Sequence, residues 1–108
     1  MSLSVPEIAE IMIEAARADA GDRWPQLQAL AECELRRLAQ ALADVEGLLA
    51  AGKVTESHAT QLVHMHQIAA RSVLVTIEGI GLLTAQQAIH AGVRAAETIN
   101  GPGKRAPL

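Results

Sequence analysis

The most constraining feature of this sequence is a row of apolar residues spaced alternately four and three apart over residues 31–49. Residues at this spacing lie along one side of an α-helix and form a heptad-type seam, which predicts a helix that packs lengthwise against another helix. The row consists of Ala31, Leu35, Leu38, Leu42, Val45 and Leu49, and it is widened by Leu27, Leu30 and Leu48.

The ends of this helix are indicated by residues that favour helix termini. Asp22 is a candidate N-cap, Pro25 falls in the first turn where its missing N–H costs little, and Gly52 stands where a C-terminal glycine is expected. The predicted helix therefore covers residues 22–51.

A shorter helix is predicted before it, over residues 5–20. Ser4 is a candidate N-cap, Pro6 lies in the first turn, and Gly21 ends the segment. Its apolar residues recur at helical spacing and are Ile8, Ile11, Met12 and Ala15.

A third helix is predicted from Thr55, a good N-cap, to Asn100. Three glycines offer points where it could bend or break, at Gly79, Gly81 and Gly92, but no cluster of turn residues interrupts it. The expected fold is therefore all-α, with a short N-terminal helix and a long antiparallel helical hairpin. We expect residues 1–100 to form one domain and residues 101–108 to be a disordered tail.

The composition supports closely packed helices that are completed by self-association. The chain has no Phe, no Tyr and one Trp, so its core must consist of many small contacts between Ala, Leu, Ile and Val. A third helix of about 45 residues would be much longer than the second. Its apolar residues beyond position 80 would then need cover from a second chain, which predicts a dimer or a multiple of dimers.

Glu78 stands out because it is the only charged residue in the apolar run 72–84. A buried carboxylate must be paired or neutralised, so Glu78 is either a site with a raised pKa or half of an ion pair that fixes packing. We expect two copies of the third helix to cross antiparallel near Leu74 and Val75, with Arg71 of one copy meeting Glu78 of the other. Gly79 and Gly81 would let the backbones approach closely.

Arg71 and Glu78 also share one side of a helix with His64 and Gln67, because these residues are three, four and seven positions apart. Such a polar stripe is either solvated or met by polar groups of another helix.

The histidines do not form a metal site within one chain. His64 and His66 point about 200° apart on a helix, and His58 is about 12 Å from His66 along the axis. No carboxylates converge on them in the expected hairpin, so no metal or cofactor is predicted. Metal binding between subunits by His58, His64, His66, His90 or Glu78 remains open.

Charge and motifs exclude several classes of function. The net charge of −3 gives no basic face for nucleic acid. The apolar run near Glu78 is too short to span a membrane, and glutamates in the first apolar stretch argue against a signal peptide. The single cysteine, Cys33, is expected in the core of a cytoplasmic protein.

No catalytic motif is present, which favours a protein that is not an enzyme. The sequence best fits a self-assembling helical bundle that serves as a scaffold, adaptor or assembly component. Two alternatives remain: a bundle that binds a metal or cofactor between subunits, and a module that binds a membrane surface or a partner helix through residues 73–83.

Overall fold

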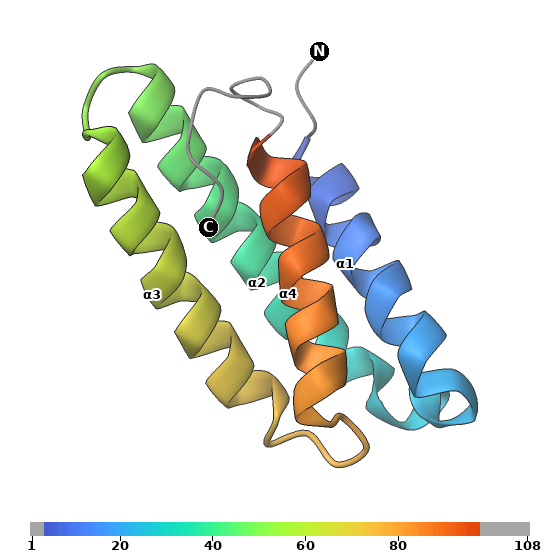
Figure 1. Cartoon of the computed structure of the whole chain (residues 1–108). Coiled ribbons are helices and arrows are strands. Elements are labelled where there is room, and N and C mark those ends of the chain that lie inside the picture. Colours follow the sequence, from blue (N-terminus) through green and yellow to red (C-terminus); the bar gives the residue numbers. More distant parts are fainter. Residues whose placement is uncertain (1–3, 98–108) are drawn as a thin grey trace.

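The computed structural model describes residues 4–97, which form four α-helices and a short 3₁₀ segment. The elements are α1 (Val5–Ala20), the 3₁₀ segment Gly21–Arg23, α2 (Trp24–Ala50), α3 (Glu56–Leu74) and α4 (Leu82–Glu97). Each helix runs antiparallel to the one before it (Figure 1). No strand occurs among residues 4–97, so the all-α prediction is confirmed for them. The tail expected at 101–108 lies outside the described residues.

Ser4 caps α1, as the sequence predicts, and Glu7 completes a capping box that the sequence analysis did not identify. The Glu7 N–H donates to the Ser4 hydroxyl (3.3 Å), and the Ser4 N–H donates to the Glu7 carboxylate (2.8 Å). These hydrogen bonds, chiefly the one from the Ser4 backbone, hold the pKa of Glu7 below its usual value. The helix ends at Gly21, whose φ of 58° lies in the left-handed region.

The end of α2 is a Schellman motif built on Gly52, which has a φ of 72°. The Gly52 N–H donates to the Leu49 carbonyl (3.1 Å), and the Lys53 N–H donates to the Leu48 carbonyl (2.9 Å). At the other end of α2 the prediction for Asp22 is wrong. Asp22 lies in the 3₁₀ segment, and no side chain caps α2.

The single helix expected from Thr55 to Asn100 is wrong, because α3 ends at Leu74 and α4 begins only at Leu82. Thr55 does cap α3, accepting a hydrogen bond from the His58 N–H at 3.1 Å. The intervening segment 75–81 turns the chain at Gly79, whose φ is 99°. Its apolar residues Ile77 and Ile80 are buried, so the segment closes the end of the bundle instead of continuing a helix.

The most extensive contact between helices joins α1 and α4, and α2 contacts α1, α3 and α4. Gly92 makes the α1–α4 contact possible, since a Cβ at this position would overlap the Met12 sulfur. At the other end of this pair, the Thr84 hydroxyl donates a hydrogen bond to the Asp19 carboxylate.

This folding-back removes the length mismatch on which the expectation of self-association depended. The stretch beyond position 80 is covered by its own chain, because Ala85, Ala88 and Ile89 are buried within the bundle. Leu82 and Leu83, in the first turn of α4, remain exposed.

Candidate functional site

A crevice between α3 and α4 carries polar side chains from both helices. His64, Gln67 and Arg71 line it from α3, and Gln86 and His90 line it from α4. The α3 residues are spaced three and four apart and the α4 residues four apart, so each set forms a stripe on its helix. The polar stripe predicted on α3 is thus met by a second polar stripe, which the sequence did not reveal.

The crevice exists because neither helix presents an apolar row to the other along this line. The buried residues of α3 are Ala59, Val63, Ala70 and Leu74, which lie on a different side of the helix from the stripe. Ile68 and Ile89 supply the apolar part of the lining. The space left between the helices is about 90 Å³ and is partly open to solvent.

The polar lining consists of one guanidinium, two imidazoles and two carboxamides, and it includes no carboxylate. Arg71 forms no ion pair with any described residue. Three other arginines each lie beside a glutamate, with separations of 2.7 Å for Arg17–Glu14 and 3.6 Å for both Arg36–Glu32 and Arg37–Glu34. The crevice therefore has an excess of hydrogen-bond donors and of groups that can carry positive charge.

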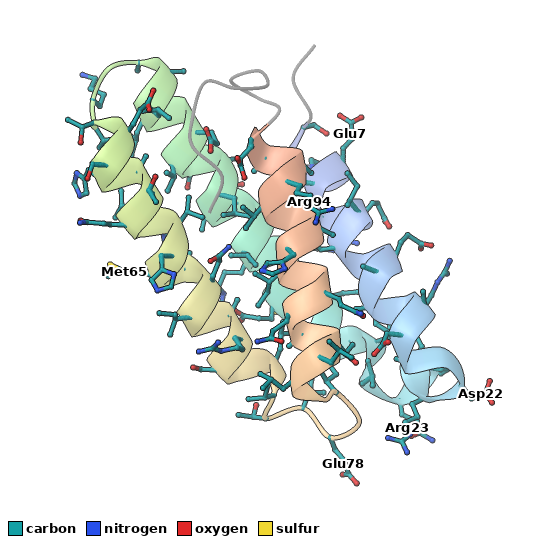
Figure 2. All side chains as sticks on the ribbon, viewed as in Figure 1. Glu7, Asp22, Arg23, Met65, Glu78 and Arg94 are labelled. Atoms are coloured by element: carbon teal, nitrogen blue, oxygen red, sulfur yellow. The ribbon has the colours of Figure 1, made fainter. Side chains whose placement is uncertain are left out.

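Glu78 is exposed in the turn 75–81, which corrects the prediction that it is buried in an apolar helix. Figure 2 shows its side chain pointing away from the end of the bundle. Glu78 lines a surface hollow together with Arg23, Gln26 and Gly79. It is therefore separated from the stripe that includes Arg71.

The predicted interface residues are also placed differently from the expected crossing of two long helices. Leu74 is buried within its own chain, Val75 is exposed, and Gly79 lies against the Leu27 side chain. Gly81 comes just before α4. A crossing centred on Leu74 and Val75 requires a helix that continues past them, and α3 ends at Leu74. The proposed interface and the association between copies both remain predictions.

The sequence did not single out the two acids that the fold buries, Glu34 and Glu46. Burial raises the pKa of Glu34, and Arg37 partly opposes this effect. Each glutamate lies three or four positions from row residues on both sides, which places it on the same side of α2. This spacing is the signal that could have identified them. Cys33, expected in the core, is exposed instead.

The histidines lie mainly on the surface. His58, His64 and His90 are exposed, and His66 is half-buried. Among residues 4–97, no group of three or more His, Cys, Asp or Glu side chains is placed to hold a metal ion. A metal site between subunits remains a hypothesis.

A second distinctive surface is the side of α3 that points away from the other helices, here called the outward face. It consists of His58, Gln61, Met65, Ile68, Ala69 and Ser72, all of them exposed. Residues 57–70 include no Asp, Glu, Lys or Arg. Met65 is 64% exposed and points away from the bundle (Figure 2). The outward face is thus accessible, partly apolar and without formal charge, apart from histidines that can gain a proton.

Comparison of the chain with protein-family models, curated proteins and solved structures found no match. None of the described helices is both long and apolar enough to cross a membrane.

Proposed function

We propose that this protein is a non-catalytic helical bundle that acts by associating with copies of itself, as a scaffold, adaptor or assembly component. The observation that carries the proposal is the outward face of α3. A surface helix usually presents charged residues to water, and this helix has none between Glu56 and Arg71.

A second copy of the chain fits this face well. In a two-fold contact the same surface meets itself, so charges near the axis would face like charges. The outward face avoids this repulsion. Met65 lies midway along α3 (Glu56–Leu74), so an antiparallel crossing at Met65 would use the whole helix. Methionine also adapts its shape readily to a new contact.

The test is to place a charge at the proposed axis with Met65→Lys. Two lysines would then face each other across the contact, and sedimentation should change from a dimer or multiple of dimers to a monomer of 11.4 kDa. Leu30→Lys is the matched control, because Leu30 is similarly exposed (65%) but lies on α2. A wild-type monomer at micromolar concentration, or equal effects of the two variants, would refute the proposal.

The same samples separate the alternatives. A metal- or cofactor-binding bundle should retain stoichiometric metal or cofactor after purification and dialysis. A membrane-binding module should float with liposomes, although the outward face lacks the lysines and arginines that surface-binding helices use. We expect the protein in the cytoplasm, where the exposed Cys33 would stay reduced.

A further inference from the structure

We propose that the crevice between α3 and α4 binds a small oxyanion, either a free inorganic ion such as phosphate or the phosphate group of a small molecule. This site lies beside the outward face, with which it shares Ile68, and it does not depend on self-association.

The first argument is the chemistry of the lining. Arg71 presents a fork of N–H donors suited to phosphate oxygens, and His64 and His90 can each donate from a ring nitrogen. Gln67 and Gln86 add carboxamide donors. No carboxylate competes for the guanidinium, since Arg71 has no acidic partner among the described residues.

The second argument is the arrangement of these groups in the fold. The donors come from two antiparallel helices and line the same space. Arg71 supplies a fixed positive charge to this crevice, and the imidazoles and carboxamides add N–H donors from both helices. An anion held between the helices would be attracted to the guanidinium and would link α3 to α4.

The third argument is size. The volume of about 90 Å³ is well below the range of roughly 300–1,000 Å³ typical of pockets for drug-sized ligands. It suits a group of a few heavy atoms, such as one phosphate. One side is open, so the remainder of a larger phosphorylated molecule could extend into solvent.

Binding should be measured by calorimetry with inorganic phosphate and with sulfate, using chloride at equal ionic strength as the reference. We expect saturable one-site binding of both oxyanions and none of chloride. Arg71→Gln should weaken binding at least tenfold. Arg94→Gln removes the same charge from α4 at a residue outside the lining, and it should change the affinity less than twofold.

Two further measurements distinguish a specific pocket from general attraction to positive charge. His90→Ala removes a donor that lines the crevice from α4, and it should weaken the binding of sulfate and of phosphate. A phosphorylated small molecule that binds more tightly than inorganic phosphate would indicate a ligand extending beyond the crevice, and equal affinities would indicate the free ion.

The outcome is separable from that of the proposed self-association. Met65→Lys should bind phosphate with wild-type affinity, because Met65 does not line the crevice. Oxyanion binding no stronger than chloride binding would overturn the proposal, as would equal effects of Arg71→Gln and Arg94→Gln.

Discussion

Helices α3 and α4 follow each other in the chain and have similar lengths, yet they are held in the bundle very differently. Eight of the 16 residues of α4 are buried, against four of the 19 residues of α3. α4 lies against both α1 and α2, whereas α3 packs mainly on α2 (Figure 1). Five of the eight buried residues in α4 are Ala or Gly, which lets the helix approach its neighbours closely.

The comparison suggests a division of roles. α4 completes the core together with α1 and α2. α3 leaves exposed its outward face, which we propose for a second copy, and its polar stripe, which we propose for an oxyanion. Because α3 has fewer buried apolar contacts, it should also be the first helix to open in local unfolding.

The largest expected effect on stability comes from shortening a buried valine, made separately in α4 and in α3 so that the two helices can be compared. Val93 on α4 and Val63 on α3 are both buried, so each Val→Ala change removes two buried methyl groups. We expect Val93→Ala to lower the free energy of unfolding by about 2 to 3 kcal/mol. It should reduce amide-exchange protection in all four helices. Val63→Ala should reduce protection mainly within α3.

Hydrogen exchange measured by mass spectrometry, together with urea denaturation, checks this prediction. Uniform loss of protection in both variants would mean that α3 is as firmly part of the core as α4. The asymmetry between the two helices would then be one of exposure alone.

A smaller effect tests the close contact of α4 with α1. A Cβ at Gly92 would overlap the Met12 side chain, which is fully buried. Overpacking typically costs about 1 to 3 kcal/mol, and alanine regains about 1 kcal/mol of helix propensity. Gly92→Ala should therefore destabilise the protein by about 1 kcal/mol in thermal unfolding.

Gly47 is the matched control, since it lies within α2 and a Cβ added there would have no neighbouring atom within 4 Å. Gly47→Ala should stabilise the protein by about 0.5 to 1 kcal/mol through helix propensity alone. If Gly92→Ala also stabilises, the α1–α4 contact has room for a methyl group, and glycine is not what permits the approach.

The contrast between helices also shows which parts of the fold could be predicted. The beginning of α1 and the end of α2 depend on local signals, the Ser4 N-cap and the C-terminal Gly52, and the sequence predicts both. The break between α3 and α4 depends on Ile77 and Ile80 reaching the core. Their apolar character fits a buried helix equally well, so only tertiary packing decides.

Only the part of the candidate site that lies on α3 could be predicted, because the part on α4 depends on the break between the two helices. His64, Gln67 and Arg71 form a stripe at helical spacing that can be read from the sequence. On one continuous helix, His90 would lie about 39 Å from His64 along the axis. The turn at 75–81 instead brings Gln86 and His90 to the same crevice. The error in the helix boundary therefore concealed the second half of the site.

The smallest expected effect concerns Glu34 on α2, the helix against which both α3 and α4 pack. Burial raises the pKa of Glu34, so folding favours its protonated form. The stability that this provides is fully present below the carboxyl's unfolded pKa and is lost as the pH rises through the folded pKa.

Glu34→Gln keeps the shape without the buried charge. It should raise the free energy of unfolding at pH 7 by less than about 1 kcal/mol, because the exposed end of the ion pair with Arg37 is lost too. At pH 4 the gain should vanish. A gain of equal size at both pH values would show that the carboxylate is solvated in the folded protein. Amide exchange of Glu34→Gln and of the wild type should be compared at pH 7. If the variant gains protection only in α3, the buried carboxylate of Glu34 destabilises α3 and not α4.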